Sequence, residues 1–116
     1  MAVYGATKRG LSMFTDAIIK ENADGPVMIG AVSPGMVITE GMLREAADMA
    51  PGEFAKQRKI LNILCDHVED VTPVLVERMI DADKHGTRIK RMTNMELTKR
   101  FATGGRVRDV FSRYGL

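Results

Sequence analysis

The chain has 116 residues, of which 45% are hydrophobic and 28% are charged, and it contains a single cysteine. This is the composition of one soluble globular unit, and no apolar run approaches the roughly 20 residues that a transmembrane helix needs. Because the N-terminus also lacks a secretory signal, we expect a soluble, cytoplasmic protein without a transmembrane segment. Cys65 has no partner for a disulfide or a metal site, and we interpret it as a packed thiol on a helix.

The net charge of +2 hides an uneven distribution along the chain. Residues 84–116 hold nine Lys and Arg against two acidic residues (+7), whereas residues 1–83 hold eight against thirteen (−5). A basic segment of this kind can bind nucleic acid, an anionic membrane surface or an acidic partner. It carries little aromatic interleaving and matches no nucleic-acid module, so we interpret it as solvated surface and expect no nucleic-acid partner.

The first part of the chain has the pattern of an α/β protein. Apolar residues recur at helical spacing over 4–21, which predicts an amphipathic helix. Helix breakers at 22–26 are followed by a continuous apolar run at 27–32, which is typical of a strand buried on both faces. The Ser-Pro-Gly segment at 33–35 then predicts a tight turn that ends the strand. Such a half-unit belongs to a parallel sheet, in which ligands bind at the carboxyl edge.

Three further helices are expected, at 39–50, 53–66 and 68–84. Thr39 suits the N-cap of the first, which ends at Pro51-Gly52. Pro73 fits only in the first turn of the third. A short strand is expected at 87–92, and the last 24 residues predict short helices broken at Gly104-Gly105.

Tyr4 and Lys8 are the residues at which we expect chemistry. Residues four apart on a helix lie on the same face, so the phenol and the ammonium can reach one ligand. An unperturbed tyrosine titrates near pH 10, but an ammonium beside it favours the phenolate and makes proton transfer easier near neutral pH. An ordinary amphipathic helix gives the same spacing, so the surrounding sequence must decide.

Two segments match a known family in order and spacing. They are Tyr4-Gly5-Ala6-Thr7-Lys8-Arg9-Gly10-Leu11 and, one helix and one strand later, Val32-Ser33-Pro34-Gly35-Met36-Val37-Ile38-Thr39. They closely resemble the Tyr-x-Ala-[Ser/Thr]-Lys and Pro-Gly-x-[Val/Ile]-x-Thr motifs of the short-chain dehydrogenase/reductase family. The resemblance implies an NAD- or NADP-dependent oxidoreductase and the C-terminal part of a helix-rich, doubly wound, parallel-sheet Rossmann fold.

The resemblance assigns roles to the matched positions only. It implies that Tyr4 is the general acid that protonates a carbonyl oxygen, or the base in the reverse reaction. Lys8 would hold the nicotinamide ribose hydroxyls and favour the phenolate, while the Val37 backbone and the Thr39 hydroxyl would bind the nicotinamide carboxamide. The implied cofactor-binding positions are Tyr4, Lys8, Pro34, Gly35, Val37 and Thr39.

The family's remaining motifs lie upstream of its tyrosine. These are the Gly-rich phosphate turn, the selector between NAD and NADP, and the catalytic serine, whereas only three residues precede Tyr4. We therefore expect 1–116 to be a partial catalytic domain without its dinucleotide-binding half, inactive and unstable alone, because strand edges and apolar helix faces lack their covers. Its expected parts are 1–39 (catalytic helix, strand and turn), 39–84 (substrate-covering helices) and 85–116 (basic segment).

The expected substrate is a carbonyl or alcohol compound, bulky and apolar, that contacts Met36 and Met42, because methionines adapt to irregular apolar shapes. Alternatively, these methionines pack inside the protein. A narrower resemblance, carried by Asn62-Ile63-Leu64-Cys65-Asp66 and Glu69-x-Val71, is to the chlorophyll b reductases and their bacterial relatives. It implies a porphyrin-like or other bulky carbonyl substrate, a plastid location for a plant or algal relative, and a basic segment near a membrane surface.

A non-enzymatic role is the alternative to catalysis: a truncated subunit that pairs with a full-length homologue or a separate N-terminal chain. In the family, the helix at 4–21 commonly lies at a dimer interface, so the resemblance implies a homo-oligomer. His67 and His85 lie eighteen residues apart, with no Cys or acidic residue to complete a ligand set, so we expect no metal.

Overall fold

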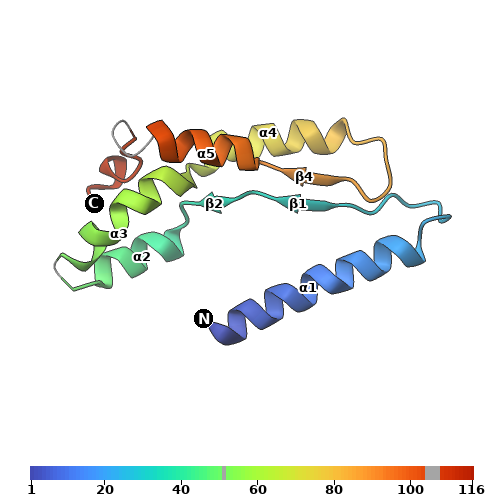
Figure 1. Ribbon diagram of the computed structural model, residues 1–116, viewed down its shortest axis with the longest axis horizontal. Helices are drawn as coiled ribbons and strands as arrows, with labels where there is room; N and C mark the ends of the chain where they lie inside the picture. The colour runs from blue at the N-terminus through green and yellow to red at the C-terminus, as the bar shows by residue number, and fades with distance from the viewer. Residues whose placement is uncertain (51, 104–107) are drawn as a thin grey trace.

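The computed structural model describes residues 1–50, 52–103 and 108–116 (Figure 1). The helices and strands in chain order are α1 (Ala2–Glu21), β1 (Ala31–Ser33), β2 (Met36–Val37), α2 (Glu40–Asp48), α3 (Glu53–Leu64), β3 (Cys65–Asp66), α4 (Val68–Ile80), β4 (Arg88–Lys90), α5 (Asn94–Thr103) and a short 3-10 helix (Ser112–Tyr114). The predicted breaks at Pro51 and at Gly104-Gly105 fall outside the described residues. Within that described part, no helix is long and apolar enough to cross a bilayer.

Both strand pairings are parallel, which confirms the α/β class. β1 pairs with β4 in the register Ala31↔Arg88, Val32↔Ile89 and Ser33↔Lys90. β2 pairs with β3 as Met36↔Cys65 and Val37↔Asp66. The strand predicted at 87–92 is therefore confirmed, with a shorter extent. The helix α4 lies along β4, and Arg78 donates a hydrogen bond to the carbonyl oxygen of Lys90 at 2.6 Å.

The helix α1 forms as predicted, and within the described residues its hydrogen bonds and ion pair to the rest of the protein come from its C-terminal half. His85 bonds the carbonyl oxygen of Ile19 through Nε2 at 2.7 Å and accepts from the Ile29 amide through Nδ1 at 3.3 Å. An ion pair between Asp16 and Arg88 lies nearby. No residue of α1 is buried, and Figure 1 shows its N-terminal turns standing apart from the strands.

The strand predicted at 27–32 differs from the one that forms. Only Ala31–Ser33 is a strand, and it is not buried on both faces, because Val32 is 43% exposed. Among the described residues, β1 has one neighbouring strand, β4, and the helix α1 contributes no buried residue. Gly30, just before it, is required by close packing: a Cβ there would lie 2.7 Å from the Thr87 carbonyl oxygen.

Two helix ends and the position of one proline also differ from expectation. Cys65 and Asp66, assigned to the end of a helix, form β3, because β2 offers them a parallel partner. The prediction that Pro73 fits only in the first turn of its helix was wrong, because Pro73 lies inside α4, beyond the first turn. The helix stops at Ile80 and not at residue 84, because Lys84 instead closes a turn with Thr87, whose hydroxyl donates to its carbonyl at 2.6 Å.

The buried core gathers where the middle of the chain meets its C-terminus. Its buried members are Ile38, Cys65, Val110 and Phe111, and the partly buried residues packed on them are Met42, Leu43, Phe54, Leu61 and Leu116. Phe54 and Phe111 meet edge to face, with ring centroids 5.2 Å apart and an interplanar angle of 80°. This geometry is the preferred one for aromatic pairs. The last residues of the chain therefore complete the core.

Candidate active site

Tyr4 and Lys8 lie one turn apart at the N-terminal end of α1. The Lys8 ammonium nitrogen is 5.6 Å from the centroid of the Tyr4 ring, within the range of a cation–π contact. Tyr4 is 60% exposed. The first turn is fixed locally, because the Thr7 hydroxyl donates to the Tyr4 carbonyl at 2.9 Å. The pair thus presents a phenol and an ammonium side by side to a ligand.

The Pro34-Gly35 segment follows the carboxyl end of β1. Gly35 has φ = 77°, in the left-handed region that favours glycine, which agrees with the unusual backbone expected there. The segment is not a tight turn, however, and the chain runs on into β2. The reason is that Met36 and Val37 find a parallel partner in β3, so the backbone stays extended.

The peptide groups of Val37 face the open edge of β2. The Ile38 amide donates to the Asp66 carbonyl oxygen at 3.0 Å, and successive residues of a strand direct their N–H groups to opposite sides. The N–H and C=O of Val37 therefore point away from β3. In the described part of the chain, β3 is the one strand paired with β2, so these two groups are open to a polar ligand such as an amide.

Thr39 is the N-cap of α2, as predicted. Its hydroxyl oxygen accepts a hydrogen bond from the Met42 amide at 3.3 Å, which satisfies one of the amides that a helix leaves unpaired at its start. The helix α2 therefore begins at Glu40, close behind the end of β2 at Val37. Because a threonine hydroxyl also has one hydrogen to donate, Thr39 can cap α2 and bind a ligand acceptor at the same time.

The two parts of the site lie in the same half of the molecule but are not joined. In Figure 1 the N-terminal turns of α1 and the β2–α2 segment both lie left of the centre of the long axis. Among the described residues, no hydrogen bond or ion pair links Tyr4 or Lys8 to the segment 34–39. The arrangement therefore supplies the ligand-binding groups on two separate elements.

The two methionines that the sequence assigns to substrate contact differ in environment. Met36 on β2 is 38% exposed, whereas Met42 on α2 packs against the buried core. The side chain of Met36 can therefore reach a ligand directly. The side chain of Met42 instead packs on the core and contributes mainly to the shape of the protein surface at α2.

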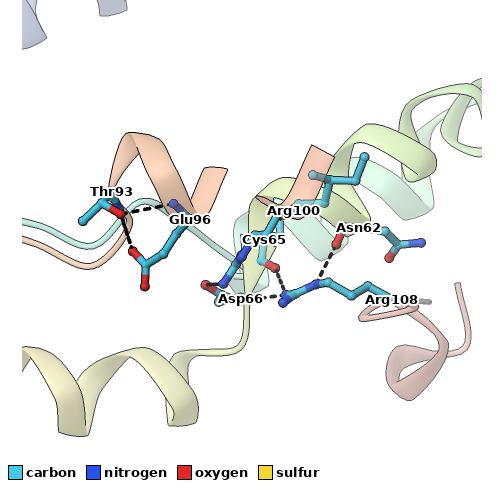
Figure 2. A network of polar contacts seen from close by, with 8 residues as sticks. Asn62, Cys65, Asp66, Thr93, Glu96, Arg100 and Arg108 are labelled. Carbon is cyan, nitrogen blue, oxygen red and sulfur yellow. Dashed lines mark hydrogen bonds and ion pairs between the residues drawn. The ribbon is translucent and has the colours of Figure 1, made fainter. Parts of the chain in front are cut away.

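A polar network that the sequence did not point to lies beside β2 (Figure 2). Asp66 is only 6% exposed, and its carboxylate accepts from Arg100 at 2.8 Å and from Arg108 at 2.7 Å. Burial raises the pKa of Asp66, but the hydrogen bonds and charges of the two arginines outweigh it and hold the pKa below its usual value. Desolvation raises the pKa of the neighbouring Cys65 thiol. The one available sequence signal was an acidic residue at the end of an apolar helix.

The same network corrects the interpretation of the basic C-terminal segment. The side chains of Arg100 and Arg108 are 15% and 30% exposed, so they are not solvated surface. Further arginines of this segment pair with acids of the first 83 residues: Arg88 with Asp16, and Arg113 with Glu69 at 3.5 Å. In the part of the chain that the structure describes, four of the nine basic residues of this segment thus pair with acidic residues of the first 83.

Comparison with known proteins gives two curated relatives. The chain is 37% identical over 92 residues to a probable chloroplastic chlorophyll(ide) b reductase of Arabidopsis thaliana, and 34% identical over 92 residues to its counterpart in rice, Oryza sativa subsp. japonica. Each match covers 79% of this chain and 17% of the relative, so the chain spans about one sixth of their length. No family model matches, and no solved structure does.

Proposed function

We propose that this chain, a relative of the chlorophyll(ide) b reductases of the short-chain dehydrogenase/reductase type, supplies the catalytic end of an NAD(P)-dependent carbonyl reductase. The observation that carries the proposal is the placement of Tyr4 and Lys8 on one exposed helix face, with the ammonium 5.6 Å from the phenol ring. The rest of the proposed fold is a doubly wound Rossmann sheet, of which β1 and β4 are two parallel strands.

In the proposed reaction, Tyr4 gives its hydroxyl proton to the carbonyl oxygen of the substrate. The nicotinamide cofactor, when bound, supplies the hydride. Lys8 stabilises the phenolate that remains, because an adjacent cation favours the charged form, and its other hydrogens hold the ribose hydroxyls. A general acid placed in this way contributes on the order of 10²–10⁴ in rate.

The segment 34–39 is proposed to orient the nicotinamide ring. The open N–H and C=O of Val37 offer one donor and one acceptor, which is the complement of a carboxamide. Thr39 adds its hydroxyl hydrogen, and the Pro34-Gly35 backbone brings the chain to this edge. Together, these donor and acceptor groups fit the nicotinamide end of the cofactor. The proposed function therefore requires α1 to be held close to β2 when a dinucleotide-binding half is present.

The proposed substrate is chlorophyll(ide) b or another bulky, apolar carbonyl compound, since the two relatives are named for that reaction. Met36, exposed on β2, is the proposed contact. A plastid is the proposed location, because both relatives are chloroplastic.

The test uses the complete reading frame that contains this chain, in which the proposal requires a Gly-rich turn and a serine about a dozen residues before Tyr4. Oxidation of NADPH and of NADH is followed with chlorophyllide b as substrate. Tyr4→Phe and Lys8→Met should each lower kcat by roughly 10²–10⁴. Tyr114→Phe is the matched control and should retain wild-type kcat. Equal rates for Tyr4→Phe and wild type would exclude the proposal.

The second candidate is a subunit that acts by pairing with a homologue. It is favoured by the apolar side chains that α1 leaves exposed, Leu11 at 56% and Phe14 at 61%. Co-purification of a stoichiometric homologous partner, without turnover of either cofactor by the complex, would support it over catalysis.

A further inference from the structure

The ladder between β2 and β3 is very short, yet it positions the segment proposed to orient the nicotinamide. Two residue pairs form it, and Asp66 takes part in the last one, opposite Val37. The Asp66 carbonyl oxygen accepts the Ile38 amide at 3.0 Å. A ladder of two residues cannot by itself fix the backbone of an edge strand, because each hydrogen bond contributes only about 1 kcal/mol net.

The side chain of Asp66 adds the hydrogen bonds that the short ladder does not have. Its two carboxylate oxygens are bound separately, Oδ2 by Arg100 at 2.8 Å and Oδ1 by Arg108 at 2.7 Å. Charge-assisted bonds of this kind are the strong class of hydrogen bond. Figure 2 shows both guanidinium groups converging on Asp66 from segments that come later in the chain.

The same arginines also close the end of α3. Arg108 donates to the carbonyl oxygens of Asn62 at 3.1 Å and Cys65 at 2.8 Å, and Arg100 lies 3.4 Å from that of Ile63. Carbonyl groups at a helix C-terminus lack helical partners and attract cations. The network therefore ties α3, β3 and the C-terminal segment into one unit, with Asp66 at its centre.

We propose that Asp66 is a positioning residue for the cofactor. Clamped by Arg100 and Arg108, it holds β3 in register with β2, so that the open peptide groups of Val37 keep the direction that the carboxamide requires. The affinity for the nicotinamide cofactor then depends on the C-terminal segment, although that segment contributes no group to the cofactor. This inference rests on the proposed function of the 34–39 segment.

The experiment compares Asp66→Asn with Arg58→Gln in the chain joined to its dinucleotide-binding half. Arg58 bonds both carboxylate oxygens of Asp109 at 2.7 Å, so its loss removes a different contact of the same C-terminal segment and leaves the two arginine bonds to Asp66 in place. We expect Asp66→Asn to raise KM for NADPH roughly tenfold with kcat nearly retained, as a displaced binding group would. The Kd from NADPH fluorescence should rise in parallel, and Arg58→Gln should change neither.

Arg108→Lys is the second variant, for the case in which Asp66→Asn does not fold. The lysine keeps a positive charge beside Asp66 but lacks the forked N–H donors of the arginine. The KM for NADPH should therefore rise by less than in Asp66→Asn. An unchanged KM and Kd in a folded variant with a lowered melting temperature would show that Asp66 is merely structural, and would overturn the inference. A wild-type protein that binds no NADPH or NADH would instead overturn the proposed function.

Discussion

The helix α1 and the unit formed by α3, β3 and residues 108–116 have similar apolar content but opposite environments. In α1, Leu11, Met13 and Phe14 are 56%, 64% and 61% exposed, whereas Cys65 and Phe111 are fully buried. The radius of gyration is 17.2 Å, against about 13 Å expected for a compact chain of this length. The C-terminal unit is covered within the chain, where Ile38, Met42 and Leu43 pack on it. The apolar face of α1 needs a cover that the described chain does not provide.

The comparison shows what a hydrophobic pattern can and cannot establish. Periodicity identifies the apolar face of a helix, but it does not say which molecule covers that face. In α1 the face remains open, and the proposed catalytic pair, Tyr4 and Lys8, lies on the same helix. Local stability should therefore differ sharply between the two regions, which amide hydrogen exchange can measure segment by segment.

The largest effect is expected for Phe111→Ala. Phe111 is fully buried and packs edge to face on Phe54, so its removal leaves a cavity and should lower the local free energy of unfolding by about 3–5 kcal/mol. Faster amide exchange in α3 and β3, with no change in α1, would be the measured result. Equal acceleration of exchange in α1 would show that the two regions unfold together, which would contradict the expected difference in local stability.

The second largest effect is expected from acidification, which should weaken the C-terminal unit. The pKa of Asp66 is lowered in the folded state, so its stabilising contribution is complete above the unfolded pKa of about 4 and is lost as the pH falls through the lower folded value. We expect loss of helical circular dichroism in that acidic range. Asp66→Asn should lack this step, and a wild-type curve that coincides with the variant's would contradict the assignment.

A smaller effect is expected for Arg58→Gln. The pair with Asp109 is partly exposed, with side chains 31% and 50% accessible, and such pairs contribute about 0.2–1 kcal/mol. Exchange in α3 should rise only slightly, and raising the salt concentration in the wild type should have a similar effect. A loss as large as that of Phe111→Ala would show that the C-terminal segment is held mainly by charge.

The smallest effect on unfolding is expected for Phe14→Ser. An exposed side chain away from packing changes stability by less than about 0.5 kcal/mol. Aggregation of the isolated chain, followed by light scattering, should fall, because a contiguous apolar face promotes association. If Phe14→Ser strongly accelerated exchange in α1, the helix would already be packed against another part of the chain.

Features set by local sequence were predictable, and those set by tertiary partners were not. The amphipathic repeat of α1 and the capping hydroxyl of Thr39 act within a few residues of themselves, so both predictions are confirmed. Cys65 and Asp66 continue a helical pattern, and only the distant β2 makes them a strand. Arg100 and Arg108 look like any basic surface residues until Asp66 is brought between them.

The same distinction applies to the site. Spacing alone places Tyr4 and Lys8 on one face, whereas the direction of the Val37 peptide groups follows from the pairing of β2 with β3, 29 positions apart (66 − 37). No local pattern encodes that pairing. The approach of α1 to β2, which the proposed reaction requires, depends on contacts outside both segments.

The parallel pairing of β1 with β4 has a consequence for synthesis. Ala31 can pair with Arg88 only after the 57 positions that separate them (88 − 31) have been synthesised. At about 5–20 residues per second, roughly 3–11 s pass between the emergence of the two strands from the ribosome. For that interval, β1 and the apolar residues before it lack β4, the partner that the structure gives them, which makes this segment a natural target for chaperones.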